Sequence, residues 1–227
     1  MKSTLLVITT AIIILSSNFS AIAQDESTPL KRGELGLRYM PTFTSVDITD
    51  SQGNDVTGVV HMQQGFGLML GFSLSSNFGL QGELNYLAIS QQYSDNDLDR
   101  QVNLQYINVP VLFSVSTSKS KQFNLKAVAG PEFSFNIGAK TKSSGSQNSD
   151  TLNTTLVVSK GNVGFAYGGG LQFAITKNHN LFFDLGYRGY VAFKEQTTTI
   201  DNGNGTAINV KLPKARNGLY IGVALQF

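Results

Sequence analysis

The residues with the clearest chemical potential are charged side chains placed within segments that are otherwise apolar or small. They are Glu34, Arg38, Glu83, Lys126, Glu132, Asp184, Arg188 and Lys194, with acidic and basic members equal in number. A buried charge is stable in a protein only when an opposite charge compensates it. We therefore expect these residues to form ion pairs in a closed interior, where they would either plug that interior or line a narrow pore.

Residues suited to catalysis are scarce. The only histidines are His61 and His179, and the chain has no cysteine. The glycine-rich stretches lack the Lys-Ser/Thr pair that completes a phosphate-binding loop. His61 near Asp47, Asp50 or Ser51 is the one candidate for the rim site of a lipid-modifying or proteolytic barrel enzyme. We favour the interpretation of both histidines as surface residues, and we expect no enzyme activity, no metal and no cofactor.

The segments that would position these charges have the pattern of β-strands, with apolar residues at every second position. They cover residues 33–46, 61–75, 78–92, 101–117, 122–139, 160–175, 180–194 and 216–227. Most exceed the five or six residues common in soluble proteins and suit the roughly 9–11 residues of a tilted membrane crossing. The sequence predicts an all-β fold, an eight-stranded antiparallel up-and-down transmembrane β-barrel.

The connections between these segments alternate in length. Residues 75–77, 118–121 and 176–179 form short turns, whereas residues 47–60, 94–100, 140–159 and 195–215 form longer polar loops. Short periplasmic turns and long outer loops are typical of outer-membrane barrels. We therefore expect both chain ends on the periplasmic side.

Alternation alone would also fit a soluble barrel with an apolar interior, such as a lipocalin. Three features favour the inverted arrangement, in which apolar residues face lipid. The second face is rich in glycine, which suits the narrow interior of eight strands, and its charges balance. Aromatic residues also sort into two groups that resemble interfacial girdles. The groups are Phe72, Phe78, Phe113, Phe123 and Phe227 near the short turns, and Tyr39, Tyr86, Tyr106 and Tyr187 toward the long loops.

The fourth segment changes its alternation near Tyr106 and Ile107, which predicts a β-bulge. Pro110 follows in the same segment and lacks an N–H group, so we expect it beside an irregular pairing.

The first residues have the features of a secretory signal peptide. Lys2 precedes an apolar run over residues 5–15, and Ala21 and Ala23 stand where signal peptidase requires small residues. We expect export through the Sec pathway, with cleavage before Gln24, which divides the chain into a signal peptide (1–23) and a barrel domain (24–227). The formal net charge is only +2, so we expect no binding of nucleic acid.

Residues 106–112, Tyr-Ile-Asn-Val-Pro-Val-Leu, resemble the fourth strand of the PorT-like outer-membrane β-barrel proteins of Bacteroidota. Weaker similarities to later strands of that family lie at residues 129–133, 168–173 and 184–188. The resemblance implies a small outer-membrane barrel, mostly of unassigned role. The namesake belongs to a protein-secretion system, but no residue here matches a secretion-specific motif. The end of the chain, from Tyr220 to Phe227, resembles the strand that the barrel-assembly machinery recognises.

These observations leave several functions open. The favoured hypothesis is a non-enzymatic, monomeric outer-membrane barrel whose outer loops bind an extracellular partner or shield the surface. A periplasmic protein partner is also possible, and outer-membrane lipid and the assembly machinery are expected partners of any such barrel. The alternatives are a narrow pore, a lipid-modifying enzyme, or a component of a secretion system.

Overall fold

The computed structural model describes residues 31–44, 47–49, 55–56, 61–95, 98–117, 122–145, 152–155, 161–176, 178–195, 197–201, 207–211 and 214–227. The proposed cleavage residues Ala21, Ala23 and Gln24 lie outside this part of the chain. Within it, no helix has the length and apolar character needed to span a bilayer.

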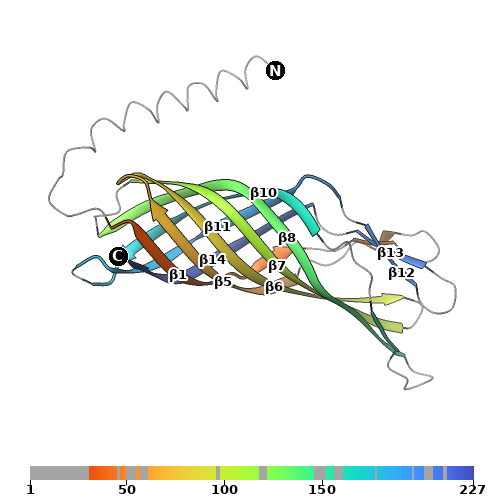
Figure 1. Ribbon diagram of the computed structural model, residues 1–227. Helices are drawn as coiled ribbons and strands as arrows, with labels where there is room; N and C mark the ends of the chain where they lie inside the picture. Colours follow the sequence, from red (N-terminus) through yellow and green to blue (C-terminus); the bar gives the residue numbers. More distant parts are fainter. Residues whose placement is uncertain are drawn as a thin grey trace, which may run out of the picture.

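The described strands close into an antiparallel barrel, as predicted (Figure 1). Its wall consists of β1 (Gly33–Tyr39) with its continuation β2 (Thr42–Thr44), β5 (His61–Ser73), β6 (Phe78–Asp95), β7 (Leu98–Ser116), β8 (Phe123–Gly145), β10 (Gly161–Ala174), β11 (Leu181–Ala192) and β14 (Ala215–Gln226). Each strand pairs with its neighbour along the chain, and β1 also pairs with β14. This last seam closes the membrane-spanning part of the wall, as hydrocarbon requires.

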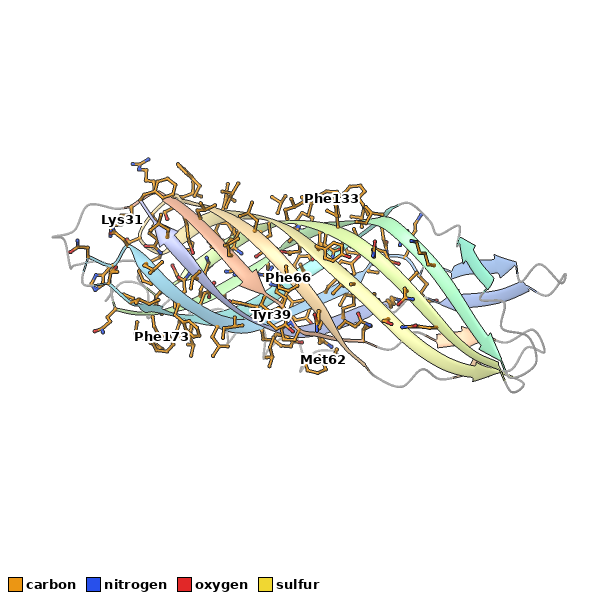
Figure 2. The ribbon with its side chains drawn as sticks, turned by 90° about the horizontal axis from the view of Figure 1, so that it is seen from below. Lys31, Tyr39, Met62, Phe66, Phe133 and Phe173 are labelled. Atoms are coloured by element: carbon orange, nitrogen blue, oxygen red, sulfur yellow. The ribbon has the colours of Figure 1, made fainter. Side chains whose placement is uncertain are left out.

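The barrel is inverted relative to a soluble protein. On β14, Leu219, Ile221 and Val223 are exposed on the outer face, whereas Tyr220 and Ala224 are buried inside. The same alternation holds on the other barrel strands, and Figure 2 shows Phe133 and Phe173 on the outer face at opposite sides of the barrel. The apolar face is therefore directed at lipid, and the second face fills the lumen.

The outer end contains more β-structure than the sequence suggested. Strands β6, β7 and β8 continue into segments that were predicted as loops, and β9 (Leu152–Thr155) pairs with the end of β8. A separate sheet has the order β12 (Thr197–Asp201), β13 (Ala207–Lys211), β3 (Asp47–Thr49) and β4 (Asp55–Val56), and Figure 1 places it far from the C-terminus. The segments predicted as longer polar loops thus contain strands, because short runs of Thr, Ile and Val pair between their polar residues.

The predicted bulge is present, but the additional residue belongs to the neighbouring strand. The register of β7 with β8 shifts between Gln105 and Tyr106, and Ile137 of β8 is left without a partner. Strand β7 keeps its own alternation, so Tyr106 points into the lumen and is 5% exposed. Its assignment to the outer aromatic girdle was therefore wrong. The misleading signal is that the lumen is lined by Leu87, Ile89 and Leu104 at this end, so apolar character does not mark the outer face there.

Pro110 lies beside interruptions in pairing, as expected. The pairs of β6 with β7 are interrupted at Val109 and Pro110 and resume at Val111. The pairs of β7 with β8 are interrupted at Val111 and Leu112. Gly130 of β8 faces this interruption, and a Cβ atom built on it would lie 2.1 Å from the carbonyl oxygen of Val111. Only glycine allows this approach of two backbones.

We expect Gly130→Ala to destabilise the barrel by about 1–3 kcal/mol, because the added methyl group displaces a neighbouring strand. Gly82→Ala is the matched control, since a Cβ atom at Gly82 has no neighbour within 4 Å. The free energy of unfolding of both variants can be measured by urea unfolding in lipid vesicles. Heat-modifiable gel migration reports the fraction of folded protein. Equal stability of the two variants would show that the close approach at Gly130 is unimportant.

Candidate functional site

The lumen contains a set of buried ion pairs, which we call the luminal cluster and divide into three layers along the strands. Its charged members are Glu34, Arg38, Glu83, Lys126, Glu132, Asp184, Arg188 and Arg216. Acidic and basic residues are equal in number, so the cluster is neutral as a whole. Seven of the eight charges assigned to the interior from the sequence are among them.

The layer nearest the short turns is built around Glu34 of β1. Lys126 of β8 approaches both carboxylate oxygens of Glu34, at 3.4 and 3.3 Å. Gln172 donates a hydrogen bond of 2.9 Å to Glu34, and Asn124 donates one of 2.9 Å to Gln172. Strands β1, β8 and β10 are thereby connected across the interior.

The middle layer contains two arginines and two carboxylates. Arg38 Nη1 lies 2.6 Å from Glu83 Oε1, and the same guanidinium donates to Asp184 through Nε and Nη2. Arg188 Nη2 lies 2.7 Å from the same Glu83 oxygen. Asn85 and Gln81 also donate to Glu83. The Glu83 carboxylate thus lies between two cations and two amides, which offset the cost of removing it from water.

Tyr220 packs directly beneath this layer. The Arg38 guanidinium carbon lies 4.5 Å from the centroid of the Tyr220 ring, a cation–π distance. The hydroxyl end of Tyr220 reaches Gly170 and Gly186, where added Cβ atoms would lie 2.1 and 2.5 Å from its oxygen. The glycines of β10 and β11 thus make room for this side chain, and Tyr220 has a packing role in the lumen in addition to its predicted role in assembly.

The outer layer pairs Arg216 of β14 with Glu132 of β8. Arg216 Nη2 lies 2.8 Å from Glu132 Oε1 and 3.3 Å from the hydroxyl oxygen of Ser134. The Arg216 guanidinium carbon lies 4.2 Å from the centroid of the Tyr190 ring. Both charged side chains are at least nine-tenths buried.

The prediction that Lys194 lies in the interior of the barrel was wrong. Strand β11 ends at Ala192, and Lys194 is exposed beyond it. The alternation along β11 was extended past the end of the strand, where it no longer fixes the direction of a side chain. Arg216 takes the place of Lys194 in the charge balance. The signal for Arg216 was present, since it lies two positions before Gly218 and four before Tyr220 on one face of the same strand.

A small cavity of about 50 Å³ lies between the middle and outer layers, with Arg188, Arg216, Glu132 and Asn108 in its lining. The Nε and Nη1 atoms of Arg188 and the Oδ1 atom of Asn108 are buried there without a protein partner. A polar cavity of this size holds a few water molecules, which would complete these hydrogen bonds.

The remaining candidates lie at the ends of the barrel. The Phe227 backbone N–H and C=O pair with Gly33 at 3.0 and 2.8 Å, and the Phe227 ring covers Gly33. The last residue therefore completes the seam between β14 and β1. His179 lies in the short turn after β10, whereas His61 begins β5, and its side chain lies outside the described residues. Among the residues that the structure describes, no group of three or more His, Cys, Asp or Glu could hold a metal ion.

We expect Arg216→Met to destabilise the barrel by about 3–5 kcal/mol, because Glu132 would remain buried without its partner. Lys194→Met, an exposed substitution of the same charge, should change stability by less than about 0.5 kcal/mol. Combining Arg216→Met with Glu132→Gln should recover much of the loss. Urea unfolding in vesicles measures these variants, and an equal loss for Lys194→Met and Arg216→Met would contradict the assignment of Arg216 to the cluster.

Comparison with known proteins places the chain in a family. The model of the outer membrane protein beta-barrel domain family matches residues 11–227. OprG from Pseudomonas aeruginosa is 12% identical, with 87% of this chain and 97% of that chain covered and a TM-score of 0.64. A major outer membrane protein from Thermus thermophilus is 10% identical, with 86% and 99% covered and a TM-score of 0.50.

These low identities show a shared fold and nothing finer. A search of curated proteins finds no match. The family model, which covers nearly the whole chain, agrees with the closed barrel and its apolar outer face. The chain belongs to the outer membrane protein β-barrel domain family.

Proposed function

We propose that this protein is a sealed, non-enzymatic barrel of the outer membrane that acts through its outer end, where it engages a protein partner. The single observation that carries the proposal is the luminal cluster. Its three layers of ion pairs join opposite sides of the barrel among the described residues.

The burial of these charges supports a plug and not a pore. The side chains of Arg38, Glu83 and Asp184 are each 1–2% exposed. An ion that crossed this layer would have to separate oppositely charged groups in a medium of low dielectric, where their attraction is strong. The cavity of about 50 Å³ has room for only a few water molecules and is too small to serve as a channel.

The length of the wall supports a role for the outer end. On the outer face of β6 the apolar residues Leu84 and Tyr86 are followed by Ala88 and then by exposed Ser90. The strand continues to Asp95, so its last residues project beyond the apolar belt. Strands β7 and β8 continue alongside it. A barrel that only had to span the membrane would not need this extension.

The other hypotheses from the sequence have less support. The rim site of the enzyme hypothesis combines His61 with Asp47, Asp50 or Ser51, but Asp50, Ser51 and the side chain of His61 lie outside the described residues, so no geometry supports it. Within the family, we propose that the chain is related to the PorT-like proteins of Bacteroidota, because residues 106–112 resemble the fourth strand of those proteins. We do not extend the namesake's secretion role to this chain, because no contact in the lumen points to it.

Planar-bilayer recording of the purified protein tests the seal. We expect no steady conductance from the wild type. Glu83→Ala combined with Arg188→Ala removes one acid and one base from the middle layer and leaves Arg38 paired with Asp184. We expect this balanced double variant to open steady, small channels.

Lys194→Ala combined with Glu195→Ala is the matched control, because it removes the same two charge types from exposed positions. It should remain silent. Steady channels from the wild type would overturn the proposal and favour the narrow pore. Silence of the luminal double variant would show that the luminal cluster is not what closes the barrel.

A further inference from the structure

The wall of the barrel splits between β5 and β6 at its outer end. The two strands pair from Ser73 and Gly79 up to Gln64 and Ala88, and no farther. Beyond that point β5 pairs with β2, whereas β6 continues with β7 as far as Asp95 and Leu98. Among the described residues, the segment 89–95 of β6 therefore has a strand on one side only.

The direction of the N–H and C=O groups in residues 89–95 follows from the pairing of β6 nearer the short turns. The N–H of Leu74 donates to the carbonyl of Phe78, so even-numbered residues of β6 direct their N–H and C=O groups toward β5. The N–H of Ser116 donates to the carbonyl of Asn77, so odd-numbered residues face β7. The register with β7 is the same on both sides of the gap at Glu83 and Leu84, and pairing is continuous from Asn85 to Asp95. Ser90, Gln92 and Ser94 thus present their N–H and C=O groups at the open edge.

Within the part of the chain that the structure describes, this edge lacks the features that usually protect an exposed strand. Such edges carry proline, lysine or a bulge, or are covered by another element. Residues 89–95 read Ile-Ser-Gln-Gln-Tyr-Ser-Asp, with no proline and no lysine, and their register with β7 shows no bulge. The segment is held in place by its partner strand, and Gln101 donates a hydrogen bond of 2.7 Å to the hydroxyl of Ser90. It is therefore a strand whose outward row of backbone donors and acceptors has no partner strand among the described residues.

We propose that the edge of β6 at residues 89–95 binds an extended segment of a protein partner by β-strand addition. In this mode of recognition, main-chain hydrogen bonds supply the affinity and the sequence of the partner is only loosely constrained. The proposal rests on the proposed function, in which the outer end engages a partner, and it names the surface and the form of that partner. The opposite edge of the extension, β9, offers only Leu152–Thr155.

A second copy of the chain does not fit this edge. Two barrels in one membrane insert the same way up, so an axis that relates them must run along the membrane normal. Barrel strands tilt by roughly 35–45°, so the two β6 edges would cross at about 70–90° and could not form a ladder. With a second copy excluded, we assign the edge to a segment of a different protein that approaches from outside.

The charge of the hairpin indicates the chemistry of that segment. Residues 89–100 contain Asp95, Asp97 and Asp99 against a single Arg100. This net negative charge favours a segment that carries Lys or Arg beside its extended part. We therefore expect the partner strand to be uncharged in the middle and basic at one end.

Amide hydrogen exchange of the full chain in lipid nanodiscs tests the proposal directly. In the free protein, we expect rapid exchange at Ser90, Gln92 and Ser94 and slow exchange at Gln91 and Tyr93. A short peptide of alternating Thr and Val with Lys at one end should slow exchange at the three edge amides. The same peptide with N-methyl groups on alternate amides should have no effect. Protected edge amides in the free protein, or no change with the unmodified peptide, would overturn the proposal.

Gln92→Pro removes an edge N–H and leaves the ladder to β7 intact, whereas Gln92→Ala keeps the N–H. In fluorescence anisotropy with the labelled peptide, we expect Gln92→Pro to weaken binding by at least about tenfold and Gln92→Ala by less than about twofold. Slow exchange at Gln91 and Tyr93 verifies that the hairpin of the proline variant is intact. Equal binding by both variants would overturn the proposal. Wild-type channel currents would instead contradict the sealed barrel, so the two failures are distinguishable.

Discussion

Inside a bilayer no water is available to the backbone, so every N–H and C=O group of a membrane-crossing strand must bond within the wall. Closure of the seam between β1 and β14 satisfies this constraint, and the rest of the structure depends on it. Closing eight strands leaves an interior only wide enough for side chains. The inner face must therefore be filled compactly, and it cannot be filled with unpaired charges.

The inner face meets both requirements by combining glycine with compensated charge. Glycines of β10 and β11 give Tyr220 the space to cross the lumen, and Tyr220 supports the Arg38 guanidinium. Arg38 in turn joins carboxylates from β6 and β11, so one side chain connects distant parts of the wall. The same ion pairs therefore stabilise the barrel and close it to ions. The seal is thus a consequence of how a narrow polar interior must be packed.

Much of the transmembrane part could be predicted from the sequence, because burial on one face forces a strict alternation. That alternation placed Glu34, Arg38 and Glu83 inside, where the structure has them. It misplaced Lys194, because alternation carries no information beyond the end of a strand. It also missed Arg216, which lies on the inner face at the start of β14.

The outer end was less predictable for a related reason. There the lumen contains Leu87, Ile89 and Leu104, so an apolar residue no longer signals the lipid side, and Tyr106 was assigned to the wrong face. The ion-pair partners could not be predicted either. Which carboxylate Arg188 meets depends on side chains that cross the lumen from strands distant in the chain, and no local pattern encodes that choice.

The central claim is that apolar side chains face lipid while the charged and small residues are sealed inside. The chain has no cysteine, so single cysteines along residues 219–226 provide unique positions for spin labels. Accessibility to oxygen and to a water-soluble nickel complex should be measured in lipid vesicles. We expect labels at Leu219, Ile221 and Val223 to collide with oxygen dissolved in lipid, and labels at Tyr220 and Ala224 to be shielded from both reagents. Oxygen collisions at positions 220 and 224 with shielding at 219, 221 and 223 would contradict the account. Ready access of the nickel complex to positions 221 and 223 would also contradict it.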